Sequence, residues 1–267
     1  MKTATCWLVL LLIIFGFTLA APKLTKLGTL PKAVLESSGI ETGDEAGTFV
    51  THNDAGNAPE LFLINRKGQL LRTIEVPGAT NLDWEDITRD TKGNLYICDT
   101  GNNNNKRTEL QIYKFSLKSP DKAEKITLHY PDQKPGAKSK KGASFDVEAT
   151  FWCRNKIYLL TKDRVNGNQT KLYEVPDQPG NHEAKLRGTY PVNGKVTAAD
   201  LSPDQKKLVL LSTGQLHVYQ PKGTNFLQNK IATVALKSVG QTEGVAFTDN
   251  QTVVFTNEKG DLYQYSF

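Results

Sequence analysis

The sequence lacks the short motifs that identify several large enzyme classes, and it has few cysteines. No GxxxxGK[ST] or GxGxxG pattern is present, which argues against the common nucleotide-binding loops. No GxSxG, HExxH or CxxC motif indicates a serine-hydrolase elbow or a zinc site. Three cysteines in 267 residues are too few for a disulfide framework. The core, not cross-links, must therefore stabilise the chain.

The two cysteines beyond the N-terminal region, Cys98 and Cys153, are predicted to be free thiols. Cys98 ends one predicted strand, and Cys153 ends another that points to the opposite face, which separates them by more than about 10 Å along the strands. A disulfide needs Cα atoms within about 7 Å of each other. We therefore expect two buried side chains that behave as small apolar residues.

Long apolar runs are missing from the sequence except at its start. There, one lysine, an apolar run from Trp7 to Phe17 and small residues up to Ala20 have the pattern of a secretory signal peptide. We predict a signal peptide over residues 1-20, one mature domain over 21-267, and a secreted or periplasmic protein without a stable membrane span. An uncleaved anchor is the alternative, although the run is shorter than the roughly 20 residues that a span needs.

The sequence also lacks a strong charge imbalance, since its formal net charge is +5. Its densest basic run, 138-KSKK-141, lies in a loop-like segment without interleaved aromatic residues. Nucleic-acid binding is therefore not expected. No heptad repeat appears. We expect a monomer.

What the sequence does contain is an internal repeat with a period of roughly 45 to 60 residues, the spacing of propeller blades with loop insertions. Each unit opens with a short polar-then-apolar strand and turns through Gly, Asp or Asn. Apolar strands such as 94-NLYIC-98 and 207-KLVLL-211 follow. The units begin near residues 37, 83, 146, 197 and 242, and the last ends one strand short.

The repeat predicts an all-β fold, a β-propeller of five four-stranded blades. The strand missing from the last unit can come from the other end of the chain, where residues around Lys23 to Leu30 would pair with Asp261 to Phe267. This N-terminal strand would close the ring and remove exposed sheet edges, which are an aggregation liability. A six-bladed ring is the first alternative, and a two-sheet sandwich is the second.

Seven short motifs follow one another along the repeats: THNDAGN, DWEDI, DTGNN, RTELQIY, FDVEA, LLTKD and TEGVAF. Their succession resembles an uncharacterised family of secreted propeller proteins common in Bacteroidetes, and the resemblance covers nearly the whole mature chain. It implies the propeller fold but no particular activity. The acidic residues at strand starts are also distantly similar to those of calcium-dependent propeller hydrolases, lactonases and phytase-like propellers.

Conspicuous polar residues fall at two places in each repeat, the start of the first strand and the end of the second. Because consecutive strands are antiparallel, both places lie on the same face of the ring, at one mouth of the central channel. We predict a ligand-binding site at this mouth. Its expected contacts are His52, Asn53, Asp54, Asp83, Asp99, Asn102, Asp146, Lys162 and Glu258.

Three glutamates occupy equivalent positions in the first strands. Aligning the repeats matches Ser38, Glu85, Glu148, Ala199 and Glu243. Carboxylates around a narrow channel repel one another unless a cation, a shared proton or basic partners compensate them. One hypothesis is a hard cation such as calcium, held by Glu85, Glu148 and Glu243. The other is an ion-pair network, with Lys162, Arg164 and His52 as the partners.

Three functions remain open, and the sequence does not decide whether the protein is an enzyme. A binding module would hold a small ligand, a glycan or a protein loop at the acidic mouth, with or without calcium. A calcium-dependent hydrolase would act on a phosphate ester or a lactone. A glycosidase would need two carboxyl groups about 5 to 10 Å apart, such as Glu85 and Glu148. The binding module is favoured, because no catalytic motif accompanies the carboxylates. Trp84 and Trp152 are expected in the core between blades rather than as sugar platforms.

Overall fold

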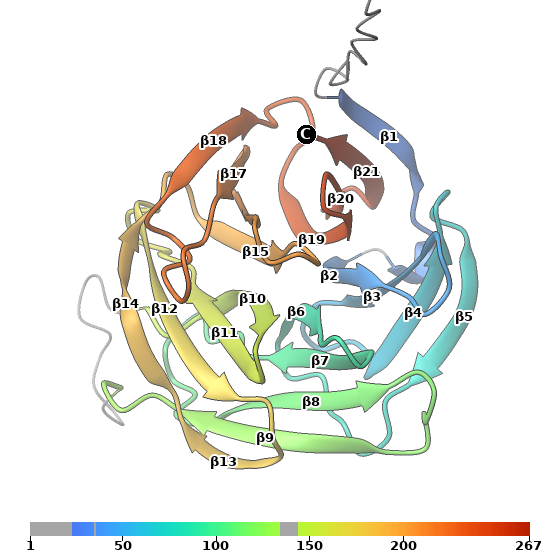
Figure 1. The fold of residues 1–267 in the computed structure, drawn as a ribbon. Coiled ribbons are helices and arrows are strands. Elements are labelled where there is room, and N and C mark those ends of the chain that lie inside the picture. Colours follow the sequence, from blue (N-terminus) through green and yellow to red (C-terminus); the bar gives the residue numbers. More distant parts are fainter. Residues whose placement is uncertain (1–22, 35, 134–143) are drawn as a thin grey trace, which may run out of the picture.

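The computed structural model describes residues 23–34, 36–133 and 144–267. These residues form 21 β-strands and one short 3-10 helix, η1 (Lys32–Val34), and the strands build five sheets. Figure 1 shows the sheets arranged as blades around a central axis. The prediction of an all-β, five-bladed propeller is confirmed. The expected signal peptide and the basic run 138-KSKK-141 lie outside the described residues.

In each blade the strands follow one another in chain order from the axis outward, except that blade 3 skips β13 and blade 5 takes its outer strand from the N-terminal end. Blade 1 contains β2 (Ser37–Thr42), β3 (Thr48–Asn53), β4 (Glu60–Asn65) and β5 (Leu70–Glu75). Blade 2 contains β6 (Trp84–Arg89), β7 (Asn94–Asp99), β8 (Leu110–Ser116) and β9 (Ala123–His129). Blade 3 contains β10 (Val147–Cys153), β11 (Lys156–Thr161), β12 (Gln169–Pro176) and β14 (Lys185–Pro191). Blade 4 contains β15 (Val196–Leu201), β16 (Leu208–Ser212), β17 (Gln215–Tyr219) and β18 (Lys230–Ala235). Blade 5 contains β19 (Thr242–Asp249), β20 (Thr252–Asn257), β21 (Asp261–Ser266) and, from the other end of the chain, β1 (Lys23–Thr29).

The N-terminal strand closes the ring, as the sequence predicts. β1 pairs antiparallel with β21, from Lys23 opposite Ser266 to Thr29 opposite Asp261. The innermost strands β2, β6, β10, β15 and β19 contact one another in a closed circle. This circle of five blades rules out both the six-bladed ring and the two-sheet sandwich.

One strand departs from the repeat. β13 (Gly180–Glu183) lies between β12 and β14 but pairs in parallel with β9 of blade 2, starting with Gly180 opposite Ile126. It covers the outer edge of blade 2, which would otherwise offer unpaired backbone groups to another chain. The repeat does not predict β13, because the other units have no counterpart to it.

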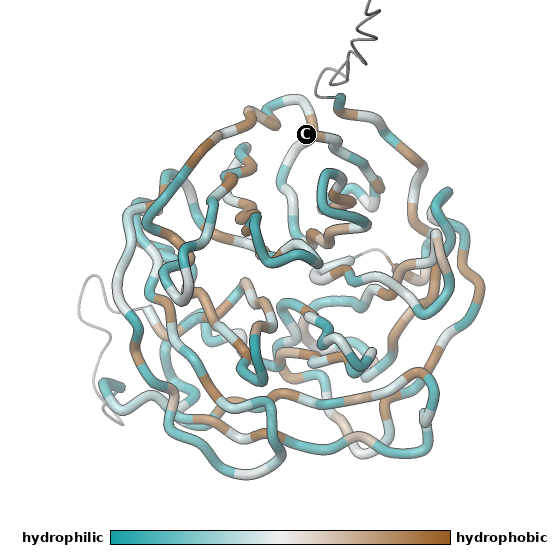
Figure 2. Tube along the Cα trace, in the orientation of Figure 1, coloured by the Kyte–Doolittle hydropathy of each residue, from teal (hydrophilic) through white to brown (hydrophobic). Residues whose placement is uncertain are grey.

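The core consists of apolar layers between neighbouring blades. Second strands such as β16 are buried along their whole length, whereas the outer strand β18 is mostly exposed. Between blades 3 and 4, the rings of Phe151, Tyr158 and Phe226 lie 4.7 to 5.0 Å apart from centroid to centroid. Figure 2 shows hydrophobic stretches along the strands of every blade. Packing between blades therefore holds the inner strands, and the site they carry, in place.

Trp84 and both cysteines occupy this core, as predicted. Trp84 is fully buried in the layer between blades 1 and 2. Cys98 and Cys153 are buried and free. Burial raises the pKa of both thiols, because it disfavours the charged thiolate. They behave as small apolar residues rather than as reactive groups. Trp152 is only partly buried, and its indole N–H donates to Asp177 at 2.8 Å.

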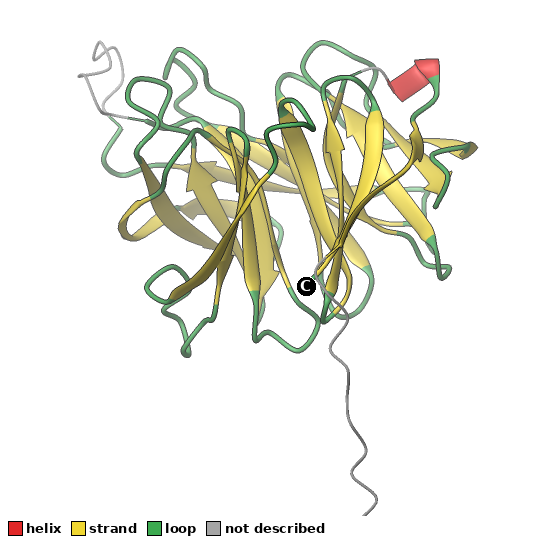
Figure 3. Ribbon diagram, turned by 90° about the horizontal axis from the view of Figure 1, so that it is seen from above, coloured by secondary structure: helices red, strands yellow, loops and turns green. Residues whose placement is uncertain are grey.

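The two faces of the ring carry different loops, and Figure 3 shows the strands running between them. First strands begin, and second strands end, on the face that carries η1. On the opposite face, Asp90, Asp204 and Asp249 each accept the backbone N–H two residues further on, which stabilises the turns between first and second strands. No helix within the described residues is long and apolar enough to cross a membrane.

Candidate functional site

Each first strand contains a β-bulge close to its start. The pairing with the second strand skips Ser38 in β2, Glu85 in β6, Glu148 in β10, Thr197 in β15, and Glu243 with Gly244 in β19. A bulge leaves a residue outside the hydrogen-bonded ladder and re-aims its side chain. Ser38 and the three glutamates line one cavity at the channel mouth. The bulges therefore explain why one position in four of the five repeats faces the cavity.

The bulges also correct the alignment of blade 4. Thr197 is the residue skipped in β15, whereas Ala199 pairs regularly with Leu210. The Thr197 hydroxyl donates to the Thr242 carbonyl at 2.8 Å, and the Ser38 hydroxyl donates to the Glu85 carbonyl at 2.7 Å. Bulged hydroxyls thus tie blade 4 to blade 5 and blade 1 to blade 2, and bulged glutamates face the cavity.

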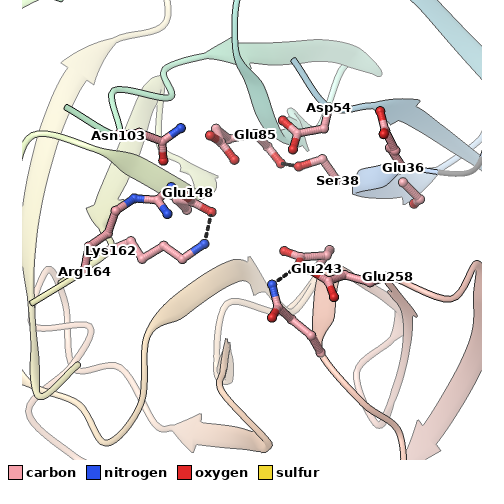
Figure 4. Close-up of a pocket in the computed structure, with 12 residues that line it drawn as sticks. Glu36, Ser38, Asp54, Glu85, Asn103, Glu148, Lys162, Arg164, Glu243 and Glu258 are labelled. Carbon is pink, nitrogen blue, oxygen red and sulfur yellow. Dashed lines mark hydrogen bonds and ion pairs between the residues drawn. The ribbon is translucent and has the colours of Figure 1, made fainter. Parts of the chain in front are cut away.

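The cavity has a volume of about 520 Å³ and a hydrophilic wall. Its lining comprises Glu36, Ser37, Ser38, Asp54, Glu85, Asn103, Glu148, Lys162, Arg164, Gln241, Glu243 and Glu258. Six of these side chains are carboxylates and two are cations. Figure 4 shows them converging from several blades on one space. An excess of acid over base gives the cavity affinity for positive charge.

The second group of lining residues follows the ends of the second strands. Asp54 comes directly after β3, Lys162 after β11 and Glu258 after β20, while Asn103 and Arg164 lie a few residues further along their loops. A second strand lies outside the first strand of its blade. Its own side chains are therefore screened from the axis, and only the residues that follow it reach the cavity.

One side of the cavity is a closed ion-pair network. Lys162 Nζ lies 2.7 Å from Glu148 Oε2, and Arg164 forms ion pairs with both Asp146 and Glu148. Burial raises the pKa of Glu148 to about 7, although the two cations oppose this. For Lys162, burial favours a lower pKa, but Glu148 outweighs it and the pKa is raised. Two acids and two bases thus neutralise each other here.

The other side brings together three carboxylates without a basic partner of this kind. Oxygens of Asp54, Asp83 and Glu85 lie within 4.8 Å of one another. Glu85 is 6% exposed, and its carboxylate has no hydrogen bond or ion pair with any described residue. Burial, followed by repulsion from nearby carboxylates, raises the pKa of Asp83 to about 6 and that of Glu85 well above its usual value. Without a bound cation, Asp83 and Glu85 therefore favour the protonated form more than an ordinary carboxyl group does.

Gly101 makes room for two of these carboxylates. A Cβ atom at this position would overlap the Asp83 carboxylate and Glu85 Oε1. The backbone of Gly101 is not in the left-handed region, so the chain conformation itself would accept a side chain there. Space for the carboxylates is what the glycine provides.

Four of the predicted contacts lie behind the cavity wall. His52 is fully buried against Trp84, with ring centroids 5.5 Å apart, and burial lowers its pKa to about 4. Asp99 accepts hydrogen bonds from Asp83 N, Arg107 and Gln111. Of the remaining two, Asn53 donates to the Ala33 carbonyl in η1, and Asn102 bonds the backbone of Arg107 within its own loop. These four residues position the wall.

Asp54, Lys162 and Glu258 line the cavity, and so do the expected metal ligands Glu85, Glu148 and Glu243. Asp83 joins Glu85 at one side. Asp146 is buried beneath the other, where it accepts from Asn102 N at 2.6 Å and pairs with Arg164. The structure thus brings most of the predicted residues to one mouth but divides them into two groups.

Sequence reasoning missed Glu36, Asn103 and Gln241 as lining residues. Glu36 directly precedes β2, and Gln241 directly precedes β19. Extending the strand-start rule by one residue would have found both. Asn103 belongs to the DTGNN motif, where Asn102 was the expected contact.

Acidic residues continue along the channel beyond the mouth. Asp86 accepts Thr150 N at 2.7 Å, and Asp200 accepts Phe247 N at 2.6 Å, so each ties its first strand to that of the next blade. Glu41 is 6% exposed and accepts a hydrogen bond from the Thr42 hydroxyl at 2.8 Å. Burial raises the pKa of all three, to about 7 for Glu41.

Comparisons with known proteins find the fold but no family. No protein-family model matches this chain, and no curated sequence matches it. The PQQ-bound aldose sugar dehydrogenase from Streptomyces coelicolor superposes with a TM-score of 0.57 at 10% identity, over 92% of this chain and 98% of that one. A gluconolactonase from Xanthomonas campestris gives 0.51 at 12% identity, over 93% and 90% of the two chains. A structural genomics protein of unknown function from Bacteroides thetaiotaomicron gives 0.53 at 9% identity, over 92% and 76%.

At such identities these likenesses show a shared architecture and carry no activity to this chain. The resemblance to propeller proteins holds at the level of the fold. Membership of the Bacteroidetes family remains a prediction.

Proposed function

We propose that the protein is a binding module whose mouth cavity takes a small hydrophilic ligand, with a calcium ion among the carboxylates. Two buried ionisable side chains, Glu85 and Lys162, support this proposal, because both can form more hydrogen bonds than the described residues provide. Among the described residues, Glu85 accepts no hydrogen bond on its carboxylate, and the Lys162 ammonium donates only to Glu148. Buried charged groups of this kind are normally satisfied by a ligand, an ion or water.

The cavity favours a small polar molecule. Its volume of about 520 Å³ falls in the range of roughly 300 to 1,000 Å³ for small-molecule sites. None of its described lining residues is aromatic, so it offers neither a stacking platform for a sugar ring nor a cage for a methylated ammonium. Hydroxyl groups of a ligand could donate to the carboxylates, and its hydroxyl or anionic oxygens could accept from Lys162 and Arg164.

The setting of this function is proposed from the N-terminal sequence. The pattern of residues 1-20 supports a secreted or periplasmic protein. We propose that it acts as a monomer, since a ring closed by its own N-terminal strand needs no partner to complete the site.

Thermal melting with a panel of sugars, sugar acids and amino acids, in calcium and in EDTA, tests the proposal. We expect at least one compound to raise the melting temperature in a concentration-dependent way. Lys162→Met should abolish this rise, measured against the variant's own melting temperature, while the exposed Lys237→Met should keep it. A rise that survives Lys162→Met would place the ligand elsewhere, and no rise with any compound would argue against the binding module.

A hydrolase is the second candidate, and the pair of Glu85 and Glu148 favours it. Their oxygens lie within 4.8 Å of each other, close to the roughly 5 Å of retaining glycosidases. A Glu148 pKa of about 7 suits a general acid or base. The gluconolactonase and the sugar dehydrogenase share only the fold, so the substrate class stays open between lactones, phosphate esters and glycosides.

Assays with gluconolactone, nitrophenyl phosphate and nitrophenyl glycosides test this candidate. Hydrolysis that Glu148→Gln lowers by at least about a hundredfold would support it. Turnover that is equal in wild type and variant would exclude Glu148 as the acid or base.

A further inference from the structure

We infer that the calcium ion is held by Asp54, Asp83 and Glu85, and not by the equivalent glutamates Glu85, Glu148 and Glu243. The mouth then has a cation site on one side and a closed ion-pair network on the other. This inference rests on the proposed function for the presence of an ion, and it adds which side chains hold it.

The geometry of the three carboxylates fits one ion. Calcium binds oxygen at roughly 2.3 to 2.6 Å, so two oxygens on the same ion lie at most about 5 Å apart. One oxygen from each of Asp54, Asp83 and Glu85 lies within 4.8 Å of the other two. All three donors are carboxylate oxygens, which suit calcium or magnesium rather than zinc or copper.

Glu85 supplies a second, independent observation. Its side chain is more than nine-tenths buried, it faces the cavity, and it is unpartnered among the described residues. Figure 4 shows Asp54 next to it across the upper part of the cavity. A buried carboxylate without a partner is costly unless something positive occupies the space in front of it.

Gly101 points to the same place. Any side chain at position 101 would overlap the carboxylates of Asp83 and Glu85. Because the backbone there does not require glycine, the absent side chain serves to let these two acids approach each other. Two acids brought together in this way repel one another, and a divalent ion converts that repulsion into binding.

Glu148 is unsuitable as a ligand, although its oxygens also lie within 4.8 Å of Glu85 and Asp146. Its two oxygens already pair with the buried Lys162 and the more exposed Arg164, so an ion there would have to displace both cations. Glu243 is in neither group of clustered carboxylates, and it accepts a hydrogen bond from Gln241 at 2.7 Å.

Isothermal calorimetry of the whole EDTA-treated protein with calcium chloride alone tests the assignment. We expect one site in the wild type and at least about tenfold weaker binding in Glu85→Gln and Gly101→Ala. Glu243→Gln should change the affinity less than about threefold, because the Glu243 carboxylate does not bind the ion and acts on it only through long-range electrostatics. Glu75→Gln, an exposed glutamate on β5, is the control for general charge loss. Circular dichroism checks that each variant folds, and Asp83→Asn replaces Gly101→Ala if that variant does not.

The outcomes separate this inference from the proposed function. Equal weakening by Glu243→Gln and Glu85→Gln would move the ion to the equivalent glutamates, which overturns the inference but leaves calcium in the site. Absence of calcium binding by the wild type would overturn the inference as well. The proposed binding function would then be tested by whether any compound of the panel raises the melting temperature in EDTA.

Discussion

The two sides of the mouth cavity use the same side chain in opposite ways. Glu85 and Glu148 are bulged residues at equivalent positions, and they are 6% and 3% exposed. Glu148 is paired with Lys162 and Arg164, whereas Glu85 faces other acids. What differs is the loop after the second strand, which supplies those two cations in blade 3 and Gly101 with Asn103 in blade 2.

This difference separates two steps in building the site. The bulge sets the direction of the side chain, and it recurs because each blade repeats the same strand pairing. The loop sets the charge around that side chain, and loops vary without disturbing the blades. One repeated scaffold can thus place a structural ion pair and a candidate cation site a few ångströms apart.

The largest expected effect on the free energy of unfolding comes from removing one cation of the ion-pair network around Glu148. Lys162→Met leaves Glu148 with one cation instead of two, so we expect it to lower the free energy of unfolding by about 3 kcal/mol. Lys156→Met removes a more exposed partner of Glu174 and should cost no more than about 1 kcal/mol. Urea unfolding at pH 7.5 in EDTA measures both. Equal losses would mean that the buried network stabilises the fold no more than the exposed pair of Lys156 and Glu174.

Buried Glu41 predicts how the free energy of unfolding changes with pH. Glu41, near Arg89 and Asp200 in the lower channel, has its pKa raised by burial to about 7, against about 4.3 in an unfolded chain. The folded state therefore holds the Glu41 proton more tightly. Its contribution is fully present below about pH 4 and is lost as the pH rises to about 7.

Between pH 5 and pH 7.5, Glu41→Gln should flatten the fall in the free energy of unfolding by about 2 kcal/mol, at about 1.4 kcal/mol per pKa unit and with part of the shift discounted. Urea unfolding at both pH values in EDTA checks this, with Glu75→Gln as the matched control. A variant with the same pH dependence as the wild type would show that Glu41 is ionised in the folded protein.

The same substitution at the two equivalent glutamates sharpens the comparison further. Glu85→Gln removes a buried carboxylate that faces other acids, so without calcium it should raise the free energy of unfolding by about 1 kcal/mol. Glu148→Gln weakens two ion pairs and should lower it by about 1 kcal/mol. The two changes in the free energy of unfolding should therefore have opposite signs. If both variants shift it in the same direction, the two sides of the cavity are electrostatically alike.

The sequence predicts more of the fold than of the site, and particular residues show why. Five blades and closure by β1 follow from the spacing of apolar strands, a pattern that packing between blades preserves. The alignment of Ala199 was wrong by two residues, because the bulged residue of β15 is Thr197 and the apolar pattern does not reveal where a bulge falls. His52 and Asp99 were expected at the mouth, but they belong to second strands that lie behind the first. The difference between Glu85 and Glu148 depends on which loop residues reach across in space, which spacing along the chain does not encode.

The smallest expected effect concerns the third bulged glutamate and completes the comparison. Glu243 is only partly buried, pairs with no cation among the described residues, and accepts a hydrogen bond from Gln241. Burial raises its pKa, but the cavity leaves it partly solvated. Glu243→Gln should therefore change the free energy of unfolding by less than about 0.5 kcal/mol, as for a polar exchange near the surface. Urea unfolding alongside Glu85→Gln and Glu148→Gln measures it. A change as large as theirs would show that the bulge position itself, and not the loop opposite it, decides the energetics of the glutamate.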